Sequence, residues 1–237
     1  MPAAPRALLL DVFGTCVDWR SGVARAVRAA APPGVGVDAG AVADAWRARY
    51  QPQLETVRSG ARPWVDLDTL HREALDDVLA AHGLDGLDGE ARDDLTRAWH
   101  RLDPWPDTVA ALARMRRHAV VAPLSNGHIA LIVALSRHAG MTWDAVLGAE
   151  PARSYKPRPE VYLQGVEALG LRPGEAMMVA CHASDLVAAD ACGLRTAFVR
   201  RPLEHGPRGA AEEPPEVAGL VADDLGALAD ALGFDPG

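Results

Sequence analysis

The feature that most constrains the fold of this chain is a set of short apolar runs that each stop at polar side chains. Each run is four to six residues long, which suits a buried strand, and the segments between them carry apolar residues at helical spacing. Strands that alternate with helices predict an α/β fold. The three runs and the polar residues after them are 7–10 with Asp11, 119–124 with Ser125 and Asn126, and 176–180 with Cys181 and His182.

The polar residues after these runs are expected to meet at one place. In an open parallel sheet the ligand crevice lies beyond the carboxyl ends of the strands, so ends that are distant in the chain can converge there. Two weaker runs, 196–199 and 220–222, are candidates for further strands. The sequence therefore predicts a Rossmann-like, doubly wound parallel sheet with a site at its carboxyl edge.

A long helical stretch interrupts this pattern between the first two predicted strands. It shows helical periodicity in 41–57 and 69–82 and contains no convincing strand. The stretch is too long for one crossover, so we interpret it as a helical cap inserted in the core. The predicted division is an α/β core of residues 1–17 and 101–237 and a helical cap of residues 18–100.

Two local predictions concern the rest of the core. Asp107 is expected to cap a helix over 108–117, because an aspartate there can accept hydrogen bonds from the first backbone N–H groups. Residues 200–217 are rich in Pro, Gly and Glu, and this composition predicts a long irregular loop.

The composition narrows the partners and the compartment. The chain has 24 basic and 32 acidic residues, a net charge of −8, which argues against a basic face for nucleic acid or an anionic membrane. Three cysteines make neither a disulfide framework nor a paired zinc spacing, and the histidines show no H-x-x-x-H pair. The N-terminal apolar stretch is too short to span a bilayer and leads to an aspartate rather than a cleavage site. We therefore expect a cytoplasmic protein with no metal site.

One residue type stands out, because Lys156 is the only lysine and the other 23 basic residues are arginine. An acidic chain can still bind a small anion where a few positive groups gather in one crevice. A compact ammonium differs in geometry from a planar guanidinium, so Lys156 is a candidate for a role that arginine does not fill. The alternative is an ordinary surface lysine.

Four segments together resemble the motifs of the haloacid dehalogenase superfamily. Their order and spacing cover nearly the whole chain, and the helical insert lies where that superfamily places its first cap type. The segments are Leu8–Thr15 with Asp11 as the strand-terminal nucleophile, Ser125–Gly127, Tyr155–Pro157 followed by Val161 and Tyr162, and Cys181–Asp185 followed by a helical segment over 186–192.

Two departures from the phosphatases of this superfamily indicate a branch. Those enzymes carry a general acid, a second Asp, two residues after the nucleophile, where this chain has Phe13. They also use an Asp to help hold Mg²⁺ where this chain has Cys181. A halide leaving group needs neither a proton nor a metal, so the chain resembles the type II L-2-haloacid dehalogenases. This resemblance implies a hydrolase without a cofactor.

The resemblance also implies a mechanism. The carboxylate of Asp11 attacks C2 of a 2-haloalkanoate, and water then hydrolyses the ester to a 2-hydroxy acid. Lys156 would keep Asp11 ionised and oriented. Asp185 would hold or activate the water or brace Lys156, and a helix N-cap is the alternative. His182, where the family commonly has Asn, would act as a base or as a donor to the halide, with a structural role as the alternative.

A second group of residues would bind the substrate and the halide. Arg47 lies in a cap segment that resembles the family segment whose arginine binds the departing halide, and we expect it to act together with Asn126. The alternative is an ordinary surface arginine on a solvated helix face, an alternative that is stronger for Arg49. Tyr162 is placed like an active-site tyrosine, and helix packing is its alternative. Aromatic side chains would line an apolar pocket, unless they are ordinary core residues: Trp46, Tyr50 and Trp64.

The turn after the first strand would hold the substrate carboxylate. Thr15 and Ser125 would orient the nucleophile and bind this group, helped by the backbone N–H groups of Val12 and Phe13. Helix capping by the two hydroxyls is the alternative.

Three classes of function remain open. The first is hydrolysis of short 2-haloacids such as haloacetates and L-2-halopropionate to hydroxy acid and halide, with fluoroacetate as a candidate substrate. The second is a phosphatase of small phosphomonoesters with replaced parts. The third is a non-catalytic member that binds a small carboxylate or a protein, which the joint presence of Asp11, Lys156 and Asp185 argues against. The resemblance also implies a homodimer, while the preferred halogen is not identified.

Overall fold

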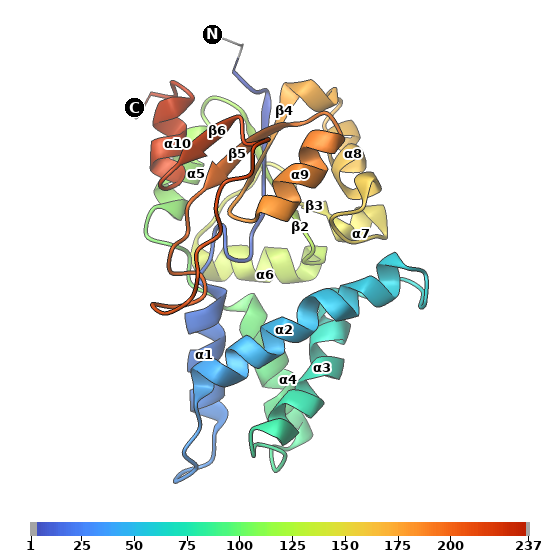
Figure 1. Cartoon of the computed structure of the whole chain (residues 1–237), viewed down its shortest axis with the longest axis vertical. Coiled ribbons are helices and arrows are strands. Elements are labelled where there is room, and N and C mark those ends of the chain that lie inside the picture. The colour runs from blue at the N-terminus through green and yellow to red at the C-terminus, as the bar shows by residue number, and fades with distance from the viewer. Residues whose placement is uncertain (1–3, 236–237) are drawn as a thin grey trace.

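The computed structural model describes residues 4–235, which form one parallel sheet with helices packed on it (Figure 1). The strands lie in the order β3-β2-β1-β4-β5-β6, and each neighbouring pair is parallel. The predicted fold class is therefore confirmed. The strands are β1 (Ala7–Leu10), β2 (Val120–Ser125), β3 (Leu147–Gly148), β4 (Ala176–Ala180), β5 (Arg195–Val199) and β6 (Leu220–Ala222).

All five predicted strands are present, and three of them have the predicted bounds. The short strand β3 was not predicted, because two residues leave no periodicity to recognise. It pairs with the end of β2 at Leu124 and Ser125. At Gly148, φ is 129° and a Cβ would meet the backbone of Ser125, so this close approach requires glycine.

Helices connect and cover the strands. Within residues 4–235 none of them is long and apolar enough to cross a membrane. They are α1 (Trp19–Ala30), α2 (Ala39–Arg58), α3 (Leu67–Ala81), α4 (Gly89–Thr96), η1 (Arg97–His100), α5 (Thr108–Met115), α6 (Ile129–Ala139), α7 (Ala149–Ala152), α8 (Pro159–Ala168), η2 (Pro173–Glu175), α9 (Ala183–Ala191) and α10 (Leu225–Ala231).

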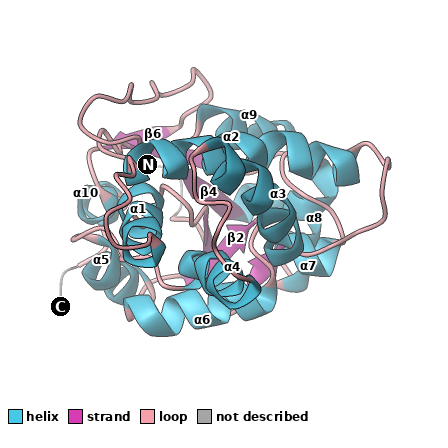
Figure 2. Cartoon of the chain, turned by 90° about the horizontal axis from the view of Figure 1, so that it is seen from below, coloured by secondary structure: helices cyan, strands magenta, loops and turns pink. Residues whose placement is uncertain are grey.

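Strand β1 is apolar throughout because both of its faces are covered. Leu8 and Leu10 belong to a core that includes α5, α6 and α10, whereas Ala7 and Leu9 belong to a separate core with α8 and α9. Alternate residues of a strand point to opposite faces, so helices on both sides of the sheet require an unbroken apolar run. Figure 2 shows the strands enclosed between these helices.

Helices α1 to α4 lie together below the sheet (Figure 1), and η1 contacts α1 and α4. Each of the four α-helices begins after an aspartate whose side chain accepts a hydrogen bond from the backbone N–H three residues later, and loss of such a cap costs about 1 kcal/mol. The expected domain boundaries, after residues 17 and 100, stay a prediction. The capping residues are Asp18, Asp38, Asp66 and Asp88.

Residues 200–219, all of them described, form turns without a helix or strand, as predicted for 200–217. Arg201 anchors this loop: it donates two hydrogen bonds to Asp107, both 2.8 Å, and one to the carbonyl of Thr15, 2.9 Å. Asp107 stands at the N-cap position of α5, as predicted, but its carboxylate makes no capping hydrogen bond there and binds Arg201 and the N–H of Leu225 instead. A bidentate, charge-assisted pair is stronger than a cap.

Candidate active site

A cavity of about 780 Å³ lies beyond the carboxyl ends of the central strands. Asp11 follows β1, Asn126 follows β2 and His182 follows β4, and all three line this cavity. Helix α2 supplies the opposite wall with Arg47 and Tyr50. The structure thus brings three strand ends and one cap helix to the same space.

Asp11 is placed by the central strand. Its backbone N–H donates to the carbonyl of Val179 at 3.0 Å, which continues the β1–β4 pairing beyond Leu10. Its carboxylate Oδ2 accepts a hydrogen bond from Oγ1 of Thr15 at 2.9 Å. Oγ1 of Thr15 itself accepts from the N–H of Cys181 at 3.0 Å, and of the two acceptors within reach of its proton, the Asp11 carboxylate at 2.9 Å is nearer and stronger than Sγ of Cys181 at 3.4 Å.

Lys156 lies between two buried carboxylates. Its Nζ donates to Oδ1 of Asp11 at 2.8 Å and to Oδ2 of Asp185 at 2.5 Å. The hydroxyl of Tyr162 donates to the other oxygen of Asp185 at 2.6 Å. The backbone N–H of Lys156 donates to Oδ1 of Asn126 at 2.8 Å, so β2 helps to place the lysine. Asp185 is the third residue of α9, where its carboxylate serves this network rather than capping the helix.

Burial and pairing set the charges of this network. Burial raises the pKa of Asp11, but the Lys156 ammonium and the hydrogen-bonded ring of His182 outweigh burial and leave this pKa below its ordinary value. Burial lowers the pKa of Lys156, but Asp11 and Asp185 outweigh it and leave this pKa raised. Burial dominates at Asp185, whose pKa is raised. Asp11 is therefore ionised at neutral pH, and Asp185 is the carboxylate that accepts a proton more readily.

A second network reaches Asp11 from the other side. Nδ1 of His182 lies 3.1 Å from Oδ2 of Asp11, and Nε2 lies 2.9 Å from Oε1 of Glu204. Glu204 is buried, and it also accepts hydrogen bonds from Nε1 of Trp19 at 3.0 Å and from Sγ of Cys181 at 3.4 Å. The sequence did not predict Glu204 or Trp19, because these partners come from distant segments and no spacing marks them.

The wall of the cavity that α2 supplies, here called the cap wall, carries the guanidinium of Arg47. The guanidinium of Arg47 lies over the ring of Tyr50, 4.2 Å from its centroid, and 5.3 Å from the ring centroid of Trp19. Among the described residues, Nη1 of Arg47 is buried and has no hydrogen-bond partner. Nδ2 of Asn126 donates to the hydroxyl of Tyr50 at 3.0 Å, and Asn126, which was predicted to act with Arg47, lines the same cavity as Arg47.

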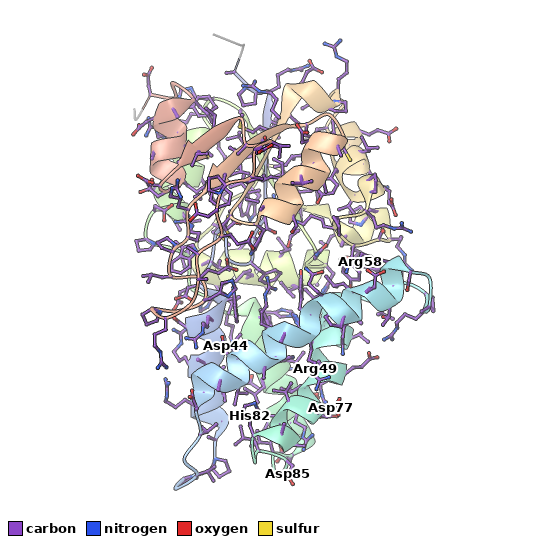
Figure 3. The ribbon with its side chains drawn as sticks, viewed as in Figure 1. Asp44, Arg49, Arg58, Asp77, His82 and Asp85 are labelled. Atoms are coloured by element: carbon purple, nitrogen blue, oxygen red, sulfur yellow. The ribbon has the colours of Figure 1, made fainter. Side chains whose placement is uncertain are left out.

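Helix α2 also contacts the backbone of Lys156. Arg58, which the sequence did not single out, donates from Nη1 to the carbonyl of Lys156 at 2.7 Å and from Nε to Glu55 at 2.8 Å. Figure 3 shows Arg58 near the end of α2 and Arg49 farther back along the same helix. Arg49 is exposed and does not line the cavity, in contrast to Arg47.

Some predicted binding residues lie elsewhere. Trp64 does not line the cavity but packs against Tyr155, with ring centroids 4.7 Å apart, so its predicted role in the pocket is corrected. Trp46 is buried in the cap and donates to the carbonyl of His71. Oγ of Ser125 accepts the N–H of Gly127 at 3.0 Å and stabilises the turn after β2.

The two apolar positions after the nucleophile differ in their exposure to the cavity. Phe13 lines the cavity, and its ring meets Trp99 edge to face at 5.8 Å. Val12 is fully buried beside it. The wall next to Asp11 is therefore a phenyl ring, which offers no proton to a leaving group.

Comparisons with known proteins agree with this arrangement. A family model described as haloacid dehalogenase-like hydrolase matches residues 5–193, a span that contains Asp11, Lys156 and Asp185. The chain belongs to the haloacid dehalogenase-like hydrolases. Within this family, an (S)-2-haloacid dehalogenase of Xanthobacter autotrophicus is 34% identical over 203 residues, which are 83% of this chain and 75% of that protein.

Solved structures of haloacid dehalogenase-like hydrolases resemble the chain over nearly its whole length. A defluorinating L-2-haloacid dehalogenase is 47% identical, with a TM-score of 0.93 over 97% of this chain and 95% of that one. The L-2-haloacid dehalogenase from Xanthobacter autotrophicus, solved with chloropropionic acid covalently bound, is 28% identical, with a TM-score of 0.81 over 97% and 98% of the two chains.

The residues around Asp11 do not fit the magnesium site of phosphatases in this family. A hard cation needs several oxygen ligands, and Phe13 and Cys181 occupy the positions of the other acidic residues. The ligand atoms of Cys181, His182 and Glu204 lie within 4.8 Å of one another, but this cluster does not fit a softer cation such as Zn²⁺ either, because burial raises the pKa of the Cys181 thiol and both ring nitrogens of His182 already bond to carboxylates. These atoms already contact each other at 2.9 to 3.7 Å as a hydrogen-bonded cluster.

Proposed function

We propose that this protein is an (S)-2-haloacid dehalogenase that converts short 2-haloalkanoic acids to 2-hydroxy acids and halide. The observation that carries the proposal is the buried pair of Asp11 and Lys156, 2.8 Å apart, in a cavity where Phe13 replaces a general acid. An ionised carboxylate can displace a halide, and a halide leaves without a proton. The names of the similar proteins support this substrate class.

In the first step Asp11 acts as the nucleophile. One carboxylate oxygen forms a bond to C2 of the substrate while the carbon–halogen bond breaks and the halide leaves with the bonding electrons. Attack from the face opposite the halogen inverts C2. The side chain of Asp11 is only 9% exposed, which limits its hydration, and Lys156 and Thr15 orient the carboxylate.

The free donor of Arg47 fits the departing halide. A buried N–H without a partner costs free energy, so a ligand that accepts a hydrogen bond from Nη1 is expected in the cavity. Asn126 lines the same corner through its contact with Tyr50. The substrate carboxylate is assigned to the backbone N–H groups of Val12 and Phe13, which follow Asp11 in the turn.

In the second step water hydrolyses the ester on Asp11. Water attacks Cγ, and the bond between Cγ and the oxygen shared with the product breaks. Asp185 accepts one proton of the water, Lys156 gives a proton to the departing alkoxide, and Asp185, 2.5 Å away, passes its proton on to Lys156, so that both groups return to their starting charges. Asp11 is released as a carboxylate, so the second proton of the water goes to solvent. The product keeps the inverted configuration and takes its new oxygen from Asp11.

Halide release tests the proposal directly. We expect halide from L-2-chloropropionate and from at least one of chloro-, bromo- and fluoroacetate in the presence of EDTA. The Asp11→Asn protein, which lacks the charged nucleophile, is expected to release none. If no substrate gives Asp11-dependent halide, the proposal fails. Phosphate release from phosphomonoesters with Mg²⁺, without any halide, would favour the phosphatase alternative.

An isotope experiment tests the ester step separately. In a single turnover in ¹⁸O water, the first hydroxy acid formed is expected to carry ¹⁶O, because its new oxygen comes from the carboxylate of Asp11. Mass spectrometry of the product measures this. Label in the first-turnover product would show that water attacks C2 directly.

The proposal also covers the compartment, the oligomeric state and the metal requirement of the enzyme. We propose that it acts in the cytoplasm as a homodimer and without a metal. Free thiols at Cys16, Cys181 and Cys192 support a reducing compartment. Sedimentation at several protein concentrations tests the dimer, and the EDTA arm of the halide assay tests the independence from metals.

A further inference from the structure

We propose that Glu204 is a positioning residue that keeps His182 doubly protonated, and that the resulting imidazolium donates a hydrogen bond to Oδ2 of Asp11 during ester hydrolysis. This inference deepens the proposed function and rests on it. It makes His182 an electrophilic donor to the reacting carboxyl group rather than a base. It also gives the irregular loop after β5 a part in the chemistry.

The positions of the two ring nitrogens carry the argument. Nδ1 of His182 lies 3.1 Å from Oδ2 of Asp11, and Nε2 lies 2.9 Å from Oε1 of Glu204. An ionised carboxylate only accepts hydrogen bonds, so each nitrogen must carry a proton to bond with its partner. A neutral ring has one N–H and would set a lone pair against one of the two carboxylates. The ring between them is therefore an imidazolium.

Glu204 is held in place although it comes from a loop. Oε1 accepts from Nε1 of Trp19 at 3.0 Å, and Oε2 accepts from Sγ of Cys181 at 3.4 Å. Arg201 fixes the same loop through its two hydrogen bonds to Asp107. Glu204 as a whole is only 3% exposed, and a buried charge is costly unless it is paired. The pairing with His182 accounts for a glutamate at this position.

Charged and titratable groups approach His182 from each element packed against it. Asp11 approaches from β1, Cys181 from the end of β4 and Glu204 from the loop, while Nε2 of His205 lies 3.7 Å from Oε2 of Glu204. Burial lowers the pKa of His182, but Cys181 and the hydrogen bonds to Asp11 and Glu204 raise it well above the ordinary value.

Two cations, Lys156 and Arg47, influence the carboxylates that bond to the His182 ring. Lys156 binds the other oxygen of Asp11, and Arg47 helps to lower the pKa of Glu204. Burial raises that pKa, but the hydrogen bond and charge of His182 outweigh burial and bring it to about 2. When Asp11 becomes a neutral ester, Glu204 is the carboxylate still bonded to the ring. Glu204 therefore keeps His182 charged at the stage where the donor is needed.

The donor acts on the tetrahedral intermediate. If Oδ1 of Asp11, beside Lys156, forms the bond to C2, Oδ2 becomes the carbonyl oxygen of the ester. Attack of water on Cγ moves the π electrons to Oδ2, which faces the N–H of His182 and the hydroxyl of Thr15. Cleavage of Cγ–Oδ1 returns these electrons to the carbonyl, and Lys156 gives a proton to the alkoxide. Donors aimed at a developing oxyanion accelerate such steps.

Glu204→Gln tests the charge on His182 without relying on turnover. The amide keeps the size of the side chain, and Glu213→Gln in the same loop is a matched control at an exposed position. Nitrogen NMR of the His182 ring at neutral pH is expected to show two N–H groups in the wild type and in the control. In Glu204→Gln the ring is expected to lose a proton at a pH at least about one unit lower.

The same variants test the chemical role. With L-2-chloropropionate, kcat of Glu204→Gln is expected to fall by about tenfold to a hundredfold above neutral pH and by less in acid, with the ester on Asp11 accumulating in mass spectra. The conservative Glu204→Asp is expected to recover part of the activity. In a His182→Asn background, Glu204→Gln is expected to cause little further loss, because it acts through the ring.

Each result bears on the inference. A neutral His182 ring in the wild type at neutral pH would overturn it, whether or not the protein releases halide. So would equal losses of kcat at all pH values, or full additivity with His182→Asn. Absence of halide release from the wild type, with a doubly protonated ring, would instead refute the proposed function and the hydrolytic role of the ring while leaving its protonation established.

Discussion

The two walls of the cavity satisfy their polar groups in different ways. On the sheet side, Asp11, Lys156 and Asp185 have partners at 2.5 to 2.9 Å. On the cap side, Arg47 keeps a buried Nη1 without a partner in the described part of the chain. A closed network holds reacting groups in one geometry, whereas an open donor is available to a ligand. This difference supports the proposal that the bond to the substrate forms at Asp11 and that the halide leaves toward Arg47.

Disrupting the hydrogen-bond network of Asp11, Lys156 and Asp185 is expected to have the largest effect on the rate of halide release. In Lys156→Arg the guanidinium keeps the charge but cannot take the place of an ammonium between Asp11 and Asp185, so kcat for halide release is expected to fall by roughly a hundredfold or more. Steady-state halide assays measure this. Arg137→Lys, at an exposed position on α6, is the control and should behave as the wild type. Activity of Lys156→Arg within twofold of the wild type would show that charge alone is enough.

Replacing Arg47, whose Nη1 has no partner among the described residues, is expected to slow only the first step, cleavage of the carbon–halogen bond. In Arg47→Lys the loss of the planar guanidinium is expected to slow carbon–halogen cleavage by about tenfold, and more for fluoroacetate than for bromoacetate, because fluoride is the poorer leaving group. Rapid-quench measurement of ester formation separates this step from hydrolysis. Arg49→Lys on the same helix is the matched control. An equal loss for both halogens, or a loss only in ester hydrolysis, would contradict the assignment of the cap wall.

The buried pair of Glu204 and His182 is expected to make stability depend on pH. The pKa of Glu204 is lowered from 4.5 to about 2, so its contribution is present above pH 4.5 and lost as pH falls through about 2. The pKa of His182 is raised above 6.5, so its contribution is present below pH 6.5 and lost as pH rises through the raised value. The difference in unfolding free energy between wild type and Glu204→Gln is therefore expected to be largest between these limits.

Urea unfolding from about pH 3 to about pH 9 measures this difference. The control is Glu213→Gln, whose difference from the wild type is expected to stay small and flat. A Glu204→Gln difference that does not vary with pH would show that the carboxylate contributes packing rather than charge.

The smallest effect on activity is expected at Trp64, which packs outside the cavity. Trp64→Leu is expected to leave kcat/KM within about twofold and to lower the free energy of unfolding by about 1 kcal/mol, because contact with Tyr155 is lost. Chloropropionate kinetics and urea unfolding measure the two quantities. A loss of kcat/KM larger than that of Tyr50→Phe, which removes a hydroxyl inside the cavity, would return Trp64 to the substrate pocket.

The strands and the strand-end residues could be predicted because their signals are local. A buried parallel strand is a continuous apolar run, and the residue after it is fixed at the edge of the sheet. Asp11 and His182 follow directly from this rule, and the unique Lys156 was recognised by residue type and motif. The two-residue strand β3 was missed because it has no period of its own.

The sequence by itself determined the fold class and the order of the motifs, because periodicity and short-range spacing are properties of the chain, whereas the role of Asp11 as nucleophile is implied by the family resemblance and stays a proposal. Only the tertiary structure decided which side chains complete the site. It buried Glu204 beside His182, set Arg58 on the carbonyl of Lys156 and placed Trp64 outside the cavity. These contacts join residues far apart in the chain, and their energies depend on burial and distance, which no local pattern encodes.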